Sequence, residues 1–355
     1  MEIGKRKIAR GVFDMGWRVG ITYNLKTDFV SGETGPIDQF EEFDREETID
    51  AIRDVLLRQG QEVVKLGGDR GLIDRLRQTP VDIVFNIAEG FEGRNREAHI
   101  PALLEFLGIP YTGSDPLTLS LTLDKSMAKR VALSEGIPTP RFKKVERFED
   151  LEGVDLRYPL FVKPCYEGSS KGIRLDSKIM DRRSLVEKVA WLLETYRSPI
   201  LVEEFVSGPE FTVGVLGNEE PSVLGVMEIE IRDTPSGEAI YSLEVKREWE
   251  EKVRYHCPPA IAPALRQKIE HVALRAYRVL GCRDVSRVDV RVGEDGEAYL
   301  LEVNPLPGLS PVYGDLPIMA GRMGWSYDQL VGAIFDHALR RYGMSGGAKG
   351  SIGCC

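Results

Sequence analysis

Two apolar segments near the C-terminus, at 287–290 (RVDV) and 299–308 (YLLEVNPLPG), each carry polar side chains inside a predicted strand. Because side chains alternate along a strand, Glu302 and Asn304 face the same side, while Asp289 lies between two valines of its own strand. Carboxylates and an amide oxygen that converge on adjacent strands are ligands that Mg²⁺ takes together with water and phosphate. The alternative is an exposed sheet face, but the leucine and valine neighbours indicate that these strands are buried. Buried carboxylates are costly without a partner, so burial favours a bound cation. The pattern therefore favours paired strands that carry a metal site.

A lysine and a glycine-rich loop follow one another in the middle of the chain. Lys163 ends the apolar segment YPLFVKP, and the loop EGSSKG follows at 167–172. Glycine permits tight turns whose backbone N–H groups suit phosphate oxygens. The loop matches neither a Walker A motif nor a dinucleotide fingerprint, and Lys163 is equally consistent with an edge lysine that reaches water. The local sequence LDKS around Lys125 predicts by itself only a surface lysine.

Two further sets of charged residues leave two interpretations open. In VEEFVSGPEF, Glu203 and Glu204 lie in an otherwise apolar strand, and Glu210 follows a turn. They form either a solvated strand face or a segment whose backbone meets an adenine while a carboxylate holds a ribose. Arg287, two residues before Asp289, either stabilises negative charge in a transition state or forms a salt bridge with that aspartate.

The first part of the chain alternates predicted strands, over 17–23, 62–66 and 81–87, with helices over 46–59 and 98–107. This order predicts a parallel sheet with right-handed crossovers. Further helices are predicted over 122–135, 181–196, 263–280 and 327–342, and further strands over 158–164, 200–206, 210–216, 285–292 and 298–303. The stretch 232–258 is long, polar and aperiodic, which is typical of a functional or disordered loop.

Composition excludes several classes of protein. The chain has 355 residues, enough for two or three domains. Its net charge of −9 argues against general nucleic-acid binding, although a local basic cluster can still hold anionic small molecules. No segment approaches the ~20 apolar residues of a membrane span, and no apolar signal-peptide core follows the basic N-terminus, so we expect a cytoplasmic protein. The scattered cysteines predict neither disulfides nor a zinc site, and 346–355, with Cys354 and Cys355, is expected to be a disordered tail.

Between Leu107 and Leu309 the segments, taken in order, resemble the ATP-grasp superfamily, and within it the D-alanine–D-alanine ligase family. The combination is specific although each motif alone is not. The matching segments are LGIPYTGSDPLTLSLTLDK, YPLFVKPCYEGSSKGI, ILVEEFVSGPEFTVGVLG, LEVK, YHCPPA, LGCRDVSRVDV and YLLEVNPLPGL.

The resemblance implies a fold of mixed α/β and α+β class. An N-terminal Rossmann-like parallel α/β domain would cover 1–120. A small ATP-grasp lobe would cover 121–215, and a C-terminal lobe at 216–345 would carry a lid loop at 232–258. The two lobes would clamp ATP between them.

The resemblance also implies roles in nucleotide binding. Lys125 and Lys163 would contact the α- and β-phosphates, and Lys246, in LEVK, would reach the nucleotide from the long loop. The loop residues that would close over the phosphates are Glu167, Gly168, Ser169 and Ser170. The residues that would line the adenine pocket are Glu203, Glu204, Phe205 and Val206, with Glu210 on the ribose.

Catalysis would use a second set of residues. Asp289, Glu302 and Asn304 would bind two Mg²⁺ ions, with Mn²⁺ as a substitute. Arg287 and the backbone N–H of Gly308 would form the oxyanion site, and Ser169 would lie near the first substrate. A carboxylate would attack the γ-phosphate of ATP to give an acylphosphate, which an amine would then attack with release of phosphate. The partners are small-molecule amino acids or carboxylates, and a homodimer is suggested only by the family.

The substrate half departs from the family pattern. The glycine-rich strand end and acidic motif of the family are absent, so that Glu46 and Glu47 are weak candidates for binding a substrate ammonium. Arg247 replaces an aromatic residue after the loop lysine, and Tyr313 lies near the usual serine in a segment one residue longer. A His-Gly-rich segment is replaced by FNIAEGFEGRNREAH, which introduces Arg94, Arg96 and His99. The added arginines favour an acidic or longer carboxylate substrate, or they form ordinary surface ion pairs.

Three functions are therefore considered. The first is a ligase that makes D-alanyl-D-alanine or a related dipeptide, as in peptidoglycan synthesis for the cell wall. The second is the same chemistry with other substrates, in natural-product or modified amino-acid synthesis. The third is a nucleotide-binding regulator without turnover, against which the intact set of Lys163, Arg287, Asp289, Glu302 and Asn304 argues.

Overall fold

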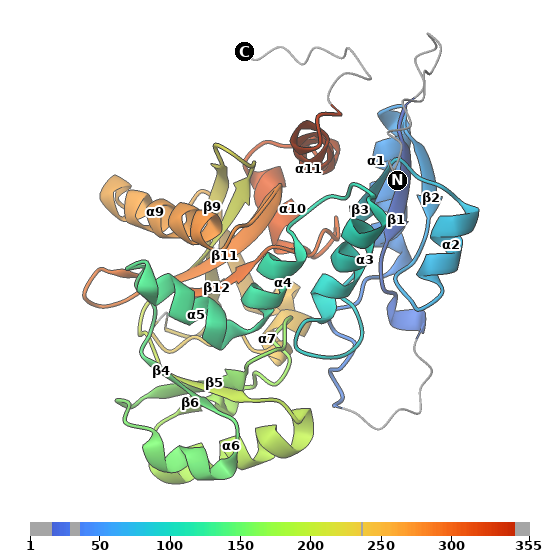
Figure 1. Ribbon diagram of the computed structural model, residues 1–355. Helices are drawn as coiled ribbons and strands as arrows, with labels where there is room; N and C mark the ends of the chain where they lie inside the picture. Colours follow the sequence, from blue (N-terminus) through green and yellow to red (C-terminus); the bar gives the residue numbers. More distant parts are fainter. Residues whose placement is uncertain (1–15, 29–35, 236, 345–355) are drawn as a thin grey trace.

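The computed structural model describes residues 16–28, 36–235 and 237–344, and these form three sheets with helices around them (Figure 1). The tail predicted at 346–355 lies outside the described residues. No helix in the described part of the chain combines the length and apolar character needed to cross a membrane.

The N-terminal domain contains the predicted parallel sheet, in the order β2-β1-β3. Its strands are β1 (Arg18–Thr22), β2 (Glu62–Lys65) and β3 (Ile83–Asn86), and its helices are α1 (Glu46–Arg58), α2 (Leu72–Gln78) and α3 (His99–Leu107). Helix α1 forms where Ile49, Ile52 and Val55 recur on one face, and all three are fully buried. Short 3-10 turns, η1 (Lys26–Asp28) and η2 (Arg96–Ala98), lie near the sheet ends.

The helix predicted over 122–135 corresponds to α5 (Lys125–Ser134), and a separate helix that was not predicted, α4 (Pro116–Leu123), precedes it. They meet at Asp124, whose carboxylate accepts hydrogen bonds from the backbone N–H groups of Ser126 and Met127. A side chain that caps in this way begins a new helix. The break places Lys125 in the first turn of α5.

The small lobe is an antiparallel sheet in the order β4-β7-β5-β6, with helix α6 (Arg182–Tyr196) packed against it. Its strands are β4 (Phe142–Val145), β5 (Leu160–Pro164), β6 (Lys178–Ile179) and β7 (Ile200–Glu204), and its 3-10 turns are η3 (Phe148–Gly153) and η4 (Leu175–Ser177). Leu160 and Val162, alternate residues of β5, belong to the apolar core of this lobe.

The C-terminal lobe is a five-stranded antiparallel sheet in the order β10-β9-β8-β11-β12. Its strands are β8 (Glu210–Leu216), β9 (Ser222–Ile231), β10 (Val253–His256), β11 (Val285–Val292) and β12 (Ala298–Asn304). Strand β8 is the middle strand of this sheet, so the small lobe ends before residue 210, and a boundary at 215/216 falls too late. The chain leaves the small-lobe sheet after Glu204, and the irregular residues 205–209 connect it to β8.

One face of this sheet is apolar, and the other combines an apolar cluster on β9 and β10 with polar side chains on β11. Val288, Val290 and Val213 pack beneath helix α9 (Pro263–Val279) in one apolar cluster. Because strand side chains alternate, Arg287 and Asp289 lie on the opposite face, which looks toward the small lobe.

The stretch 232–258 contains more regular structure than its lack of periodicity indicates. It includes α7 (Leu243–Arg247), α8 (Trp249–Lys252) and the edge strand β10. These elements are four or five residues long, too short for a helical period to repeat.

The last helices, α10 (Asp315–Arg322) and α11 (Tyr327–Arg341), return the chain to the N-terminal domain (Figure 1). Ile334 and Phe335 of α11 share one apolar cluster with Val19 and Ile21 of β1. The two ends of the described chain therefore pack together.

Asp38 connects the N-terminal domain to the small lobe. Its fully buried carboxylate accepts hydrogen bonds from the backbone N–H of Gly172 (3.1 Å), from Arg174 Nη2 (3.1 Å) and from the hydroxyl of Tyr196 (2.8 Å). The glycine-rich loop is thus fixed at its C-terminal end by a residue of another domain.

Asp284 makes the corresponding connection on the other side of the molecule. It is fully buried at φ 64° and accepts hydrogen bonds from the backbone N–H of Gly113 (2.8 Å), from Asn218 Nδ2 (2.9 Å) and from Arg341 Nη2 (2.8 Å).

We expect Asp284→Asn to lower the free energy of unfolding by about 3 kcal/mol, because Arg341 would lose its buried carboxylate. Urea denaturation measures this change. Asp328→Asn is the matched control, since its pair with Arg58 lies on the surface with side chains about half exposed and should affect stability little. Equal losses in the two variants would contradict the assignment of Asp284 as the main connection.

Candidate active site

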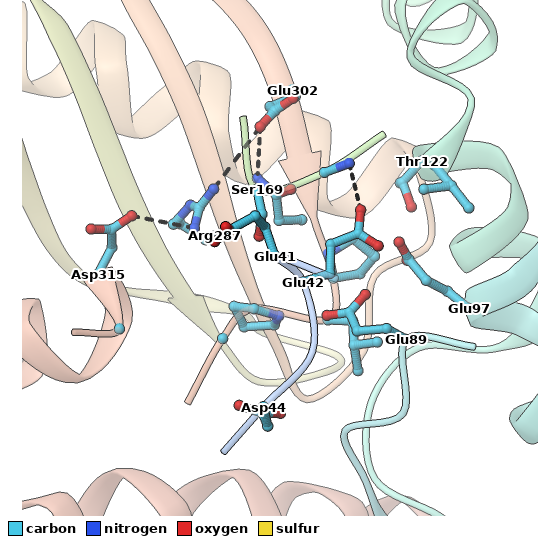
Figure 2. Close-up of a pocket in the computed structure, with 18 of the residues that line it drawn as sticks. Glu41, Glu42, Asp44, Glu89, Glu97, Thr122, Ser169, Arg287, Glu302 and Asp315 are labelled. Carbon is cyan, nitrogen blue, oxygen red and sulfur yellow. Dashed lines mark hydrogen bonds and ion pairs between the residues drawn. The ribbon is translucent and has the colours of Figure 1, made fainter. Parts of the chain in front are cut away.

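Two adjoining cavities lie where the three parts of the chain meet. We call the first the interlobe cavity; residues of both lobes line it, among them Lys163, Phe205 and Glu210. We call the second the acidic cavity; Asp44, Glu89 and Glu97 of the N-terminal domain line it (Figure 2). The cavities adjoin each other, because they share the lining residues Lys125, Gly168, Ser169, Lys246, Arg287, Glu302 and Asp315.

A buried carboxylate, Glu203, and two buried lysines, Lys125 and Lys163, line the interlobe cavity. Glu203 is buried and forms ion pairs with Lys163 Nζ (2.8 Å) and Lys129 Nζ (3.0 Å). Burial acts to raise the pKa of Glu203, but the two ammonium groups keep it below its usual value. Burial lowers the pKa of Lys129 to about 8, whereas Glu203 holds the pKa of Lys163 above its usual value.

The segment from Glu203 to Val206 lines the interlobe cavity, as does Glu210. Glu204 also forms ion pairs with Arg141 and Arg157 (both 3.1 Å) on the outer side. The ring of Phe205 lies between Arg291 and Lys178, each 4.5 Å from its centroid. A solvated strand face was one of the two interpretations of this segment in the sequence, but Glu203 and Phe205 line the interlobe cavity.

The polar side chains of β11 and β12 converge at the boundary between the cavities. Asp289 lies opposite Glu302, and Arg287 lies opposite Asn304, in the register of the two strands. Asn304 Nδ2 donates to Asp289 Oδ2 (3.1 Å), and the hydroxyl of Thr212 donates to Asp289 Oδ1 (2.5 Å). Two carboxylates and an amide at this spacing have the donor chemistry that suits Mg²⁺.

Arg287 lies among three carboxylates, and Figure 2 shows two of them, Glu302 and Asp315, beside it. Its guanidinium donates to both oxygens of Asp289 (3.1 and 3.0 Å) and to Asp315 Oδ2 (3.4 Å), and it lies 3.9 Å from Glu302 Oε1. Both interpretations from the sequence therefore remain compatible with its position, since it pairs with Asp289 and also lines both cavities.

The glycine-rich loop is attached to its surroundings at several points. Ser169 and Ser170 adopt left-handed backbone conformations, with φ of 49° and 59°. The hydroxyl of Ser170 donates to the carbonyl of Tyr241 (3.1 Å), and Lys125 Nζ donates to the carbonyl of Glu167 (2.6 Å). These bonds hold the loop against α5 and against the segment that leads to α7.

Glu42 is a site residue that the sequence did not indicate. Its buried carboxylate accepts hydrogen bonds from the backbone N–H of Gly168 (2.7 Å) and from Arg96 Nη2 (2.7 Å), and it pairs with Lys171 Nζ (3.0 Å). Although burial acts to raise it, the two cations lower the pKa of Glu42 to about 2. Glu42 lies in an irregular segment without a motif or a periodic pattern. Its partners are distant in sequence, so the sequence alone did not indicate its role.

The structure places most of the proposed substrate residues away from the two cavities. Glu47 is exposed on α1, and neither it nor Glu46, which pairs with Lys65, lines either cavity. Asp44, just before α1, lines the acidic cavity in their place, and so do Tyr313 and Gly308. His99 is exposed in the first turn of α3 and lines neither cavity.

The three arginines of the substrate half all have carboxylate partners. Arg94 pairs with Asp124 (2.9 Å), Arg96 with Glu42, and Arg247 with Glu41. None of the three lines the interlobe or the acidic cavity. Their contacts agree with the alternative of internal and surface ion pairs, and a preference for an acidic substrate stays a prediction.

Asp44, Glu89 and Glu97 differ from the other carboxylates of the acidic cavity. They form no ion pair with any residue that the structure describes. Burial raises the pKa of Asp44 to about 7 and that of Glu97 to about 7, and it raises the pKa of Glu89 well above its usual value.

Two antiparallel lobes that enclose a lysine-lined cavity beside paired carboxylate strands define the ATP-grasp class of enzyme. Comparison with known proteins agrees with this class. A family profile described as D-ala D-ala ligase C-terminus matches residues 132–336.

Several relatives extend the match over most of the chain. A D-alanine--D-alanine ligase of Carboxydothermus hydrogenoformans is 37% identical over 297 residues, which cover 81% of this chain and 91% of that protein. An uncharacterized protein, y4sG of Sinorhizobium fredii, is 35% identical over 301 residues, with coverage of 82% and 88%. The structure of a D-alanine--D-alanine ligase from Bacillus anthracis complexed with ATP superposes with a TM-score of 0.71 at 23% identity, covering 93% of this chain and 100% of that one. The chain belongs to the D-alanine–D-alanine ligase family of ATP-dependent ligases.

The raised pKa values predict how stability depends on pH. A carboxyl whose pKa is higher in the folded than in the unfolded chain binds its proton more tightly when folded, so stability falls as pH rises through that interval. Between pH 5 and pH 8 we expect the free energy of unfolding to fall in both the wild type and Glu97→Gln. The decrease should be smaller in Glu97→Gln, by about 1–3 kcal/mol. Urea denaturation at successive pH values measures the difference, and parallel curves would show that Glu97 does not titrate in this range.

Proposed function

We propose that this protein joins the carboxyl group of one amino acid to the amine of another, with ATP as the phosphoryl donor and ADP and phosphate as products. The observation that carries this proposal is the junction of the two cavities. There Lys125 and Ser169 face the carboxylates of β11 and β12, so that a nucleotide and a second ligand would meet.

The interlobe cavity supplies the groups that a nucleotide requires. When bound, ATP supplies the phosphoryl group that activates a carboxylate. Lys125 and Lys163 would neutralise its phosphates, and the backbone of Gly168 to Ser170 would cover them. Phe205 and Val206 would contact the base, with Glu204 beside them and Glu210 on the ribose.

Asp289, Glu302 and Asn304 would hold Mg²⁺, and Mn²⁺ would replace it. The two carboxylates and the amide fit a hard cation, which would neutralise phosphate charge when bound. Arg287 and Lys125 balance the carboxylates in the ligand-free protein, since each lies within 4 Å of one of them. We infer that these ion pairs loosen when the metal and the nucleotide enter.

Four residues at the junction would act on the reacting groups. Arg287 and the backbone N–H of Gly308 would stabilise the oxyanion that forms when the amine attacks the activated carbonyl. Ser169 would orient the first substrate. Lys246 lines both cavities, and its ammonium group forms no ion pair or hydrogen bond with a described residue, so it would be free to reach the transferring phosphate.

The identity of the two amino acids is a separate question. Relatives that carry the name D-alanine--D-alanine ligase make D-alanine the first pair to test, with a role in peptidoglycan synthesis. The same chemistry with other amino acids is the second candidate, favoured by the changed substrate half. Because the lysines, the arginine and the metal-site carboxylates are all present, a non-catalytic regulator is disfavoured.

The test measures ADP formation with Mg²⁺ and a panel of D- and L-amino acids, singly and in pairs, with products identified by mass. We expect Lys163→Ala to lower the rate about 100-fold or more, because an uncompensated phosphate charge raises the barrier. Lys143→Ala, which changes an exposed lysine of β4, is the matched control. Chelation with EDTA should abolish turnover, and Mn²⁺ should restore part of it.

Thermal unfolding midpoints of the two variants distinguish lost chemistry from lost folding. Turnover by Lys163→Ala at the wild-type rate would contradict the assigned role. An absence of ADP formation with every pair would contradict the ligase function itself.

A further inference from the structure

Helix α7 carries Lys246, which lines both cavities. Burial lowers the pKa of this lysine, and no counter-ion among the described residues fixes its ammonium group. The helix is only five residues long, too short to be stable by its own hydrogen bonds. The position of the ammonium group therefore depends on what holds α7.

Apolar and backbone contacts hold the first part of α7. Leu243 and Val245 are buried, and the hydroxyl of Ser242 accepts a hydrogen bond from the backbone N–H of Val245 (3.4 Å). The backbone N–H of Leu243 donates to the carbonyl of Ile173 (3.1 Å), just after the glycine-rich loop. The last two residues of the helix have charged side chains, so its C-terminal end is attached in a different way.

Ion pairs attach that end to the N-terminal domain. Arg247 donates from Nε to Glu41 Oε1 (3.0 Å), and its Nη2 donates to the same oxygen. A longer route runs through Glu244, which lies 3.5 Å from Arg174 Nε, while Arg174 Nη2 donates to Asp38. The pair of Arg247 with Glu41 is the direct link.

The chain around Glu41 is a fixed support for this link. The backbone N–H of Lys26 donates to the carbonyl of Asp44, and the backbone N–H of Asp44 donates to the carbonyl of Asn24 (both 3.0 Å). Lys26 Nζ also lies 3.6 Å from Glu41 Oε2. Each oxygen of the Glu41 carboxylate therefore has a cation beside it.

The effect of this ion pair is local. Its side chains are partly exposed, 45% for Arg247 and 24% for Glu41, so the pair contributes little to the stability of the whole chain. Arg247 and Lys246 are adjacent, however, and whatever fixes one fixes the backbone of the other.

We propose that Arg247 is a positioning residue, and that its pair with Glu41 holds the ammonium group of Lys246 where the transferring phosphate of ATP lies. Arg247 itself lines neither cavity, so it acts through Lys246. This inference rests on the proposed function and adds two residues to its recognition of phosphate.

The test measures the dissociation constants of ATP and ADP with Mg²⁺ by isothermal titration calorimetry, which requires no amino-acid substrate. ADP lacks the transferring phosphate, so the ratio of the two constants reports the contact that Lys246 makes. We expect Lys246→Ala and Arg247→Ala each to reduce the preference for ATP over ADP about 10-fold. Arg247→Lys, which keeps the charge, should restore most of this preference.

Arg266→Ala is the matched control. Arg266 forms an ion pair with Glu270 on α9 of similar exposure, 39% and 27%, and neither residue lines the two cavities. The preference for ATP should be unchanged in this variant. Thermal unfolding midpoints near that of the wild type show that each variant folds.

Two further variants separate positioning from direct electrostatics. If only charge mattered, removal of a carboxylate by Glu41→Gln would strengthen the binding of ATP, because ATP is an anion. If the ion pair positions Lys246, Glu41→Gln lowers the preference for ATP as Arg247→Ala does. Arg247→Ala added to Lys246→Ala should cause no further loss, because a residue that acts through another has no effect once the other is removed.

The outcomes distinguish this inference from the proposed function. A wild-type protein that binds ATP no better than ADP, or an unchanged preference in Arg247→Ala, would overturn the inference and leave the ligase function standing. Equal losses in Arg247→Ala and Arg266→Ala, a raised preference in Glu41→Gln, or additive losses in the double variant would also overturn it. Failure of the wild type to bind ATP at all would contradict the proposed function itself.

Discussion

Buried carboxylates need cationic partners, and this requirement determines how the three parts of the molecule meet. Glu203 joins α5 to the small lobe through Lys129 and Lys163, and Glu42 joins the N-terminal domain to the glycine-rich loop through Arg96 and Lys171. Breaking one member of such a pair leaves an uncompensated charge, which costs more than the pair itself contributes. The site is therefore held together by the same charges that a nucleotide and a metal ion would later use.

These charges are distributed differently in the interlobe cavity and in the adjoining acidic cavity. Lys125, Lys163 and Lys246 line the interlobe cavity, and their ammonium groups suit phosphate. In the acidic cavity, Asp44, Glu89 and Glu97 form no ion pair with a described residue, and burial keeps their pKa values raised. Arg287 and Glu302 lie where the two environments meet, which is where a phosphoryl group and a carboxylate would react.

Much of the fold could be predicted from the sequence, because apolar periodicity is a local signal. The parallel sheet, α6, α9 and the strand pair that carries Asp289 and Glu302 follow from such patterns, and the ordered motifs identified the family. What could not be predicted depends on contacts between distant residues. Glu42 lies in an irregular segment and acquires its role only when Gly168 and Arg96 fold against it. The sequence does not show that Arg94, Arg96 and Arg247 have partners, because each pairs with a carboxylate that is distant along the chain.

The contacts of Asp38 and Glu42 have a consequence for the timing of events in the site. Both residues belong to the N-terminal domain, and both hold the loop that would cover the phosphates, Asp38 at Gly172 and Glu42 at Gly168. A movement of the small lobe large enough to release a nucleotide must break these bonds, and it also displaces one wall of the acidic cavity. The entry and exit of the two ligands are thus kinetically linked through a single loop, so the residence time of one depends on the presence of the other.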